Sequence, residues 1–247
     1  MGTAVTMRRI AEVSPRSKAR LAGACEALEG LTFTYGQVVI LDKLVVSGNA
    51  AATAANILEH ERLFRLGFAS CIIGIGFHIA WAYLFYDLFK PVNRRLSAFA
   101  VCVILVGCAV QAVTTLLYFA PLLVLRGGSS LSAFTTEQLQ ALAYTFVRLN
   151  GAAFNLYLVF FGLWCFLVGY LIFRSTFLPR ILGVLLAIDG LGWMLYVVPP
   201  FAIHLFPVIA VASGISELPL QLWLLTVGVN PERWKEQASA AGISAGR

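Results

Sequence analysis

The sequence has 247 residues, of which 60% are hydrophobic and 12% are charged. A soluble domain of this size usually carries about 25% charged residues, so the composition argues against a water-soluble globular protein. The formal net charge is +6, but the basic residues stand at the ends of apolar runs, so we expect no binding to nucleic acid.

The chain opens with a polar and basic segment, residues 1–19. The apolar run that follows is long, and no small-residue cleavage site ends it early, so this region does not resemble a cleavable signal peptide. We expect residues 1–19 to be cytoplasmic and the first apolar run to stay in the mature protein.

Six apolar segments follow, each long enough to cross a hydrocarbon core of about 30 Å at about 1.5 Å per residue. In lipid each segment must be a helix, because its backbone groups have no water to bond. We therefore predict an all-α fold, a polytopic bundle of six transmembrane helices over residues 20–229, followed by a cytoplasmic tail at 230–247. The predicted spans are Leu21–Val46, Leu66–Phe89, Leu96–Leu125, Gly151–Phe173, Phe177–Val198 and Ile203–Val227.

The distribution of basic residues predicts the orientation of these spans. Most of the 18 Lys and Arg residues fall in segments on the same side as the N-terminus, most clearly in the short loops Lys90–Arg95 and Arg174–Arg180. Under the positive-inside rule, both termini are expected on the cytoplasmic side of the membrane.

Two connections carry helix signals of their own. Residues 49–65 are Ala-rich and then charged, which predicts a helix capped at Ser47 or Asn49 and lying on the outer membrane surface. Residues 135–138 (TTEQ) are typical of a capping box, and we expect the helix that it opens to run through Arg148 into the fourth span.

Prolines mark the last third of the chain. Pro199 and Pro200 separate the fifth and sixth spans, and Pro207 and Pro219 fall inside the sixth. Proline inside a helix removes a backbone hydrogen bond, so the sixth span is expected to be kinked. The kinks either border a cavity or serve packing alone.

The sequence contains no recognisable cofactor or metal motif. It has no GxGxxG, P-loop, HExxH or GxSxG pattern, and its three histidines do not favour a bis-histidine haem. No CxxC pair and no Cys/His cluster has zinc spacing. We expect no cofactor, no metal, and five buried, reduced thiols, at Cys25, Cys71, Cys102, Cys108 and Cys165.

Ionisable residues inside the predicted spans are the main functional candidates, because a charge near the bilayer centre is costly. Glu29, Asp189 and Glu217 fall at a common depth, roughly 13–17 Å from the cytoplasmic ends of their helices at about 1.5 Å per residue. His78 falls at a similar depth, and Glu26 shares a helical face with Glu29. These groups either form a buried acid site or hold helices together.

Aromatic residues accompany these acids in the predicted spans. Aromatic faces stabilise cations, and protonation of an olefin leaves a carbocation that must be shielded from water. Acids surrounded by aromatic rings therefore suggest such chemistry, although lipid contact explains some of the rings. The candidate substrate-binding residues are His78, Trp81, Trp164, Trp193, Trp223, Tyr196, Asn155 and Gln221.

Five stretches of the sequence resemble one known family. They are NAAATAANILEHERLFRLGF, LFKPVNRRLSAFA, FTTEQLQALA, VFFGLWCFLVGYLIFRSTFLPRILGVLLAIDGLGW and ISELPLQLWLLTVGV. The family is an uncharacterised group of bacterial six-helix membrane proteins carried as a domain of unknown function, and the resemblance covers about residues 20–229. It implies the fold and topology above and no agreed activity.

The resemblance also bears on individual positions. In the family's pattern a histidine often stands at the place of Asn150 and another polar residue at the place of Trp164, so a site built on those side chains is altered here. Glu217 stands where the family usually has an acid in its last span, which strengthens it as a candidate.

A weaker resemblance, in size, buried acids and aromatic content, is to bacterial integral-membrane terpene cyclases. It implies acid-initiated cyclisation or isomerisation of an isoprenoid or other lipid-like substrate by a membrane-buried acid. Among the buried acids of this sequence, we expect Glu217 or Asp189 to be the general acid and Glu29 its partner or the final base. The alternative is a non-enzymatic small transporter, lipid binder or accessory subunit of a membrane complex. Either hypothesis predicts contact with membrane lipid and allows a homo-oligomer.

Overall fold

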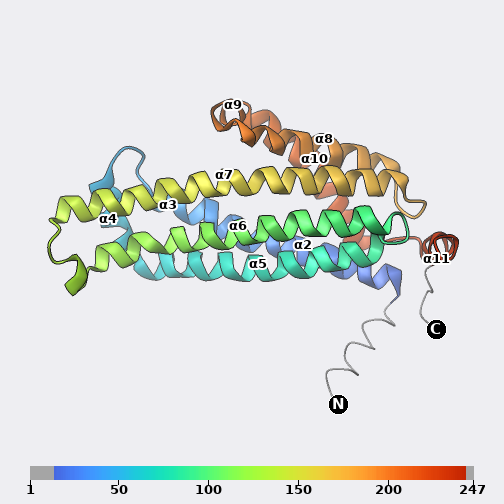
Figure 1. Ribbon diagram of the computed structural model, residues 1–247, viewed down its shortest axis with the longest axis horizontal. Coiled ribbons are helices and arrows are strands. Elements are labelled where there is room, and N and C mark those ends of the chain that lie inside the picture. The colour runs from blue at the N-terminus through green and yellow to red at the C-terminus, as the bar shows by residue number, and fades with distance from the viewer. Residues whose placement is uncertain (1–13, 243–247) are drawn as a thin grey trace, which may run out of the picture. The chain divides into compact units, whose positions relative to one another are not determined.

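A computed structural model describes residues 14–242, which form helices joined by short turns (Figure 1). No strand occurs within this part of the chain, so the predicted all-α fold is confirmed. Residues 1–13 of the predicted N-terminal segment and residues 243–247 of the predicted tail lie outside the described residues.

Five helices in the described part are long and apolar enough to cross a membrane. By helix length and composition the chain is therefore a multi-pass membrane protein. The spans are α5 (Glu61–Phe89), α6 (Arg94–Arg126), α7 (Thr136–Arg174), α8 (Arg180–Met194) continued by the 3-10 turn η3 (Leu195–Val197), and α10 (Phe206–Thr226).

The first predicted span differs from these five. Three helical segments follow one another there without a break: α2 (Pro15–Thr34), the π-helix η1 (Tyr35–Ile40) and α3 (Leu41–Leu44). α2 begins earlier than predicted and includes Arg16, Lys18 and Arg20. These charges lower its mean hydropathy, and α2 is not among the five helices that qualify as spans by composition.

The predicted helix over residues 49–65 is two helices. α4 (Ala50–Glu59) is capped by Asn49, whose Oδ1 accepts a hydrogen bond from the backbone N–H of Ala52. The helix ends at His60, which has left helical geometry, and the following charged residues open α5. The cap is thus Asn49 rather than Ser47, and the predicted C-terminal boundary was wrong.

The predicted capping box is confirmed at the start of α7. The backbone N–H of Gln138 donates to Oγ1 of Thr135 (3.3 Å), and the backbone N–H of Thr135 donates to Oε1 of Gln138 (2.9 Å). This reciprocal pair satisfies two backbone donors at the helix end. α7 then continues through Arg148 without a break to Arg174.

The helix breaks near the start of the predicted sixth span, at Leu205. A short helix, α9 (Pro199–His204), is followed by a turn at Leu205, and α10 begins at Phe206. Pro207 therefore lies in the first turn of α10, where a missing N–H costs nothing. Only Pro219 lies inside this helix, so the predicted kink at Pro207 is replaced by a helix start.

The chain divides into two compact units, each built from separate stretches of sequence. Unit 1 contains the residues up to Ala27, Ile79–Val106 and the residues from Leu158 on, and unit 2 contains Leu28–His78 and Gly107–Tyr157. The long helices α2, α5, α6 and α7 each contribute to both units.

Unit 2 has its own apolar core. Ile57 of α4 joins Ile40, Phe64, Tyr118 and neighbouring leucines in one buried cluster, and the rings of Phe64 and Tyr118 lie 4.7 Å apart.

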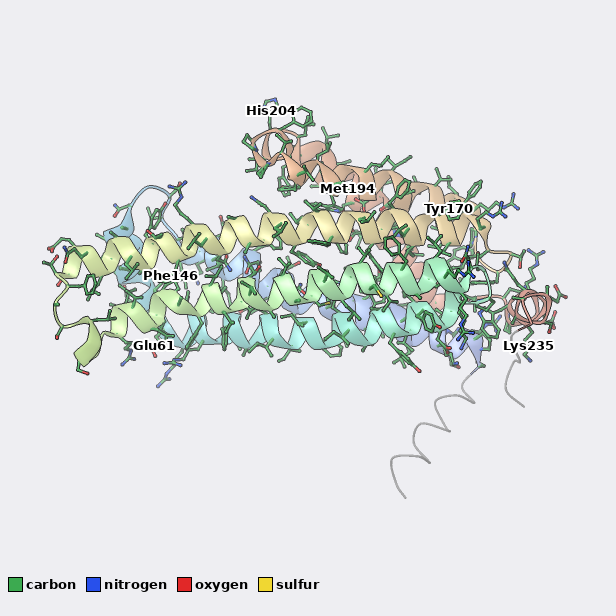
Figure 2. The ribbon with its side chains drawn as sticks, in the orientation of Figure 1. Glu61, Phe146, Tyr170, Met194, His204 and Lys235 are labelled. Atoms are coloured by element: carbon green, nitrogen blue, oxygen red, sulfur yellow. The ribbon has the colours of Figure 1, made fainter. Side chains whose placement is uncertain are left out.

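Ion pairs of one glutamate link α5 and α6 in unit 2. Glu61, labelled in Figure 2 at the start of α5, forms ion pairs with Arg65 and with Arg126 at the end of α6. These pairs tie the start of α5 to the end of α6.

In unit 1, α7 and α8 run antiparallel and approach closely at two pairs of glycines. A Cβ added to Gly190 would lie 2.5 Å from the carbonyl oxygen of Gly162, and one added to Gly183 would lie 2.5 Å from that of Gly169. No side chain fits at either crossing. Small residues that let backbones touch are typical of helix packing in membranes.

The C-terminal helix α11 (Pro231–Ala240) docks on unit 1. Asn230 caps it by accepting from the backbone N–H groups of Glu232 and Arg233. The buried Trp234 donates from Nε1 to the carbonyl oxygen of Leu88 at the end of α5 (2.9 Å). The described part of the predicted tail is therefore an anchored helix.

We expect Gly190→Ala to lower the apparent melting temperature of the detergent-purified protein. The added methyl group meets backbone atoms of α7, and such overpacking typically destabilises by about 1–3 kcal/mol. Gly214→Ala is the matched control in α10, because a Cβ there meets nothing within 4 Å and alanine is the better helix former. Equal melting temperatures for the two variants would contradict the close approach of α7 and α8.

Candidate functional site

Two predicted acids lie close together in unit 1, and a cysteine lies beside them. Sγ of Cys165 on α7, a carboxylate oxygen of Asp189 on α8 and one of Glu217 on α10 all lie within 4.8 Å of one another. Cys165 is 2% exposed and Asp189 is 1% exposed, whereas Glu217 is half-buried. We call these three residues the acid cluster, and Asp189 and Glu217 the acid pair.

The two carboxylates of the acid pair have different hydrogen-bond environments. Oε1 of Glu217 accepts from Oγ of Ser213 (2.8 Å) and from Nε1 of Trp193 (3.2 Å). Asp189 lies beside Glu217, Ser216 and Trp193, but neither of its oxygens makes a hydrogen bond of normal geometry with a described residue.

Helical spacing explains how these side chains come together. Asp189 and Trp193 are one turn apart on α8, and Ser213 and Glu217 are one turn apart on α10, so each pair shares a helical face. α8 and α10 pack against each other (Figure 1).

The glycine pairs add α7 to this arrangement. Cys165 lies between Gly162 and Gly169 on α7, and a Cβ on Gly190 would come within 3.1 Å of the Cβ of Cys165. The short distance between α7 and α8 therefore brings the thiol next to the residue that follows Asp189.

A third predicted acid, Glu26 of α2, belongs to the same unit. It is half-buried and near enough to Cys165 to interact with it electrostatically. α2 packs on α10 at Gly23, where a Cβ would lie 2.9 Å from that of Leu224. Unit 1 thus contains three of the four predicted catalytic acids.

Glu29, the fourth predicted acid, belongs to unit 2. Its Oε1 lies 3.2 Å from Nδ1 of His78 and 3.5 Å from Nε2 of Gln111. His78 is completely buried, and the ring of Tyr157 meets it edge-on at 6.1 Å. Glu29 therefore has an imidazole and an amide as neighbours, unlike the carboxylates of the acid pair.

The predicted aromatic residues fall into different surroundings. Trp193 stacks on Tyr196 with ring centroids 6.0 Å apart, and Phe161 contacts Trp193 edge-on at 6.3 Å. Trp81 and Trp164 are buried and pack on each other at 5.5 Å. Trp223 is 36% exposed on α10, and the polar candidates Asn155 and Gln221 are half-buried on α7 and α10.

The position predicted to differ from the family pattern, Asn150, has a structural role in unit 2. Its Nδ2 donates to the carbonyl oxygen of Thr114 (2.8 Å), and its Oδ1 accepts from Nε2 of Gln37 in the π-helix (2.7 Å). Both amides are buried, so this pair joins three helical segments within the unit.

The cysteines are only partly as predicted. All five are free, and four are buried, but Cys102 is exposed because its side chain points outward from α6. A thiolate and two carboxylates are ligand types that bind divalent transition metals. Cys165, Asp189 and Glu217 are therefore the residues that could hold a metal ion.

Sequence reasoning missed two members of this site. Ser213 stands four residues before Glu217, and that spacing on one helix was a usable signal. Cys165 carried no such signal, because it is far in sequence from both carboxylates and belongs to no metal-binding spacing.

The sequence of the whole helical region matches a known family. Residues 21–228 match the family described as a domain of unknown function, DUF4386. The chain belongs to this family. The predicted resemblance to an uncharacterised family is thereby confirmed, and the description of DUF4386 assigns no activity. No curated protein and no solved structure matches the chain.

We expect a membrane-permeant maleimide to label Cys102 and to leave Cys165 unlabelled in the folded protein. Cys102 is exposed and Cys165 is buried, and thiol reactivity requires access as well as thiolate character. Intact-mass spectrometry of variants that keep one cysteine each measures the labelling, and denaturant should make both react. Rapid labelling of Cys165 in the native state would contradict the burial of the acid cluster.

Proposed function

We propose that this protein is an integral membrane enzyme that uses the acid pair to transform a lipid-like substrate of the isoprenoid or terpenoid class. The reaction is acid-initiated cyclisation or isomerisation. The observation that carries the proposal is the meeting of Asp189 and Glu217 from neighbouring helices, with Ser213 and Trp193 donating to Glu217.

The acid pair is proposed to share one proton. Two carboxylates this close cannot both ionise readily, so one of them remains an acid. Ser213 and Trp193 stabilise the charged form of Glu217, which leaves the proton on the more deeply buried Asp189. Asp189 is then the general acid and Glu217 the general base.

The proposed reaction balances without an oxidant or a reductant. The Asp189 proton is transferred to one carbon of an olefin, whose π electrons form the new C–H bond and leave a carbocation at the neighbouring carbon. A second double bond of the same chain attacks that cation in a cyclisation, or a neighbouring C–H bond breaks in an isomerisation. Glu217 accepts the proton lost at the end, and transfer from Glu217 to the neighbouring Asp189 restores the starting state.

Aromatic residues beside the acid pair support this chemistry. Trp193 donates to Glu217 and stacks on Tyr196, so ring faces lie next to the proposed reaction centre. Such faces stabilise a cation without reacting as a nucleophile. Glu217 and Trp193 are half-buried, so a substrate dissolved in the bilayer is proposed to approach on their side.

The proposed membrane arrangement has six spans in a bacterial plasma membrane. The 30 consecutive helical residues of α2, η1 and α3 are about 45 Å long at about 1.5 Å per residue, which is sufficient for a first span. Basic residues at the ends of α5, α7 and α8 favour a cytoplasmic location for both termini. α4 would then lie on the outer membrane surface.

We expect Asp189→Asn and Glu217→Gln each to lower turnover at least 10²-fold, since general acid–base catalysis typically contributes about 10²–10⁴-fold. The substrate class is first obtained by mass spectrometry of small molecules extracted from the purified wild type and from Glu217→Gln. Glu232→Gln on the exposed face of α11 is the control, and it should keep full activity.

Two other outcomes would contradict the proposed enzyme activity. Full activity in both acid variants would exclude the acid pair as the catalytic groups. Bulk phospholipid alone in the extracts, together with loss of folding rather than of activity in the variants, would favour a transporter, a lipid binder or an accessory subunit.

A metal-dependent reaction is the second candidate, because the acid cluster has three possible ligands within 4.8 Å. For the proton mechanism we expect chelation to leave turnover unchanged and Cys165→Ala to keep most of it. Turnover is measured before and after dialysis against a chelator. Loss of activity on dialysis, with recovery on adding Zn²⁺ or Co²⁺, would favour the metal mechanism instead.

A further inference from the structure

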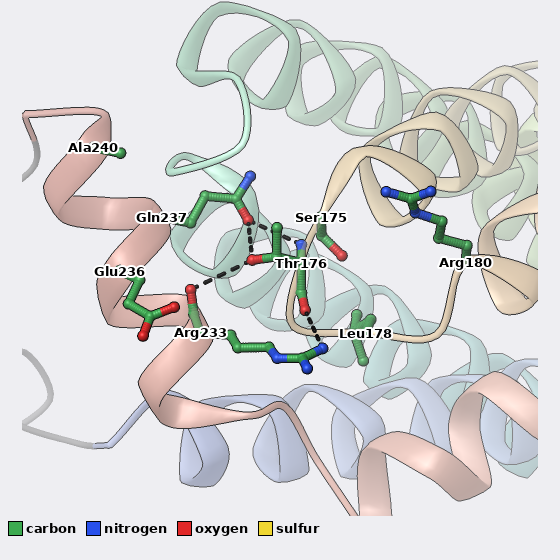
Figure 3. A pocket seen from close by; sticks show the side chains of 8 residues that line it. All are labelled: Ser175, Thr176, Leu178, Arg180, Arg233, Glu236, Gln237 and Ala240. Atoms are coloured by element: carbon green, nitrogen blue, oxygen red, sulfur yellow. Dashed lines mark hydrogen bonds between the residues drawn. The ribbon is translucent and has the colours of Figure 1, made fainter.

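A cavity separate from the acid cluster lies in unit 1, where the turn between α7 and α8 meets α11 (Figure 3). Its volume is about 740 Å³. Arg180 comes from the start of α8, Thr176 from the turn, and Arg233 and Gln237 from α11. The proposed reaction uses none of these residues.

The walls of this cavity are fixed by hydrogen bonds between its own residues. Oε1 of Gln237 accepts from the backbone N–H and from Oγ1 of Thr176, both at 3.0 Å. Nη1 of Arg233 donates to the carbonyl oxygen of Thr176 (3.4 Å). Next to the cavity, the backbone N–H of Asn230 donates to the carbonyl oxygen of Phe177. Figure 3 shows the bonds at Thr176 as dashed lines. A ligand would therefore enter a site that is already ordered.

The charges in the cavity favour an anion. Two arginines and one carboxylate, Glu236, line it, and neither arginine forms an ion pair within the described part of the chain. The guanidinium of Arg180 lies over the ring of Phe173, 5.7 Å from its centroid, which orients it and leaves its edge N–H donors available.

Two lysines of the same unit have an acidic partner. Asp87 forms ion pairs with both Lys18 and Lys90. Arg180 and Arg233 form no ion pair with a described residue, and both line the cavity.

We propose that this cavity binds a phosphate group through Arg180 and Arg233. A guanidinium donates two parallel hydrogen bonds to a phosphate, and arginine is the preferred residue for this geometry. The cavity lies at the ends of the apolar helices α7 and α8, and basic pockets in that position bind the head groups of anionic lipids. The phosphate therefore belongs to an anionic lipid or to a soluble phosphorylated compound, and the cavity serves binding rather than the reaction at the acid pair.

The test compares binding of phosphatidylglycerol and phosphatidylcholine to the full-length chain by native mass spectrometry. Arg180→Gln/Arg233→Gln should bind phosphatidylglycerol about tenfold more weakly than the wild type, a difference of about 1.4 kcal/mol. Arg94→Gln/Arg95→Gln removes the same charge from exposed residues outside the cavity, and it should bind like the wild type. Arg180→Gln alone is included because Arg233 also supports α11.

Competition with inorganic phosphate distinguishes the two sources. Binding of phosphatidylglycerol that withstands millimolar phosphate supports a lipid head group. Binding of inorganic phosphate that depends on Arg180, without preference for phosphatidylglycerol, supports a soluble compound. Equal binding by wild type and both cavity variants, or an equal loss in the Arg94/Arg95 control, would overturn the proposal. Turnover at the acid pair is measured separately, so either hypothesis can fail without the other.

Discussion

The distance between α7 and α8 is the constraint on which the acid cluster depends. Gly162 faces Gly190 and Gly169 faces Gly183, so backbone touches backbone at two levels. A side chain at either level would separate the helices and withdraw Cys165 from the carboxylates. Between helices in lipid, close van der Waals packing replaces much of the hydrophobic driving force that operates in water. The same contacts that stabilise the pair of helices therefore also set the spacing of the site.

The buried carboxylates of the two units have different neighbours. In unit 2, Glu29 lies beside His78 and Gln111, so an imidazole proton can compensate its charge. In unit 1, Asp189 lies beside a second carboxylate and a thiol. Burial of uncompensated charge in a bilayer is costly. The unit 2 arrangement suits a stable contact between helices, and the unit 1 arrangement is the one on which the proposed proton transfer rests.

Local signals in the sequence predicted the elements well, and contacts between distant residues limited the rest. The capping box at Thr135 and the cap at Asn49 were visible because both act within four residues. The depth argument placed Glu29, Asp189 and Glu217 at one level, since about 1.5 Å per residue applies to any helix, and of these three Asp189 and Glu217 meet in unit 1, whereas Glu29 belongs to unit 2. Depth along a helix does not give the direction in which a side chain points, which is why Cys165 was overlooked and Cys102 was expected to be buried. The helix start at Phe206 was missed because proline is tolerated in a first turn as well as at a kink.

The hydrogen bond from Trp234 to Leu88 has a consequence for the order in which the chain can assemble during synthesis. Every residue of unit 2 precedes Leu158, so the ribosome has made all of unit 2 before the last third of the chain emerges. Unit 1 is different, because Leu88 at the end of α5 accepts a hydrogen bond from Trp234, which is made 146 positions later in the sequence. Domains generally fold as their residues become available. Unit 2 is therefore expected to form first, and docking of α11 is among the last steps of biogenesis.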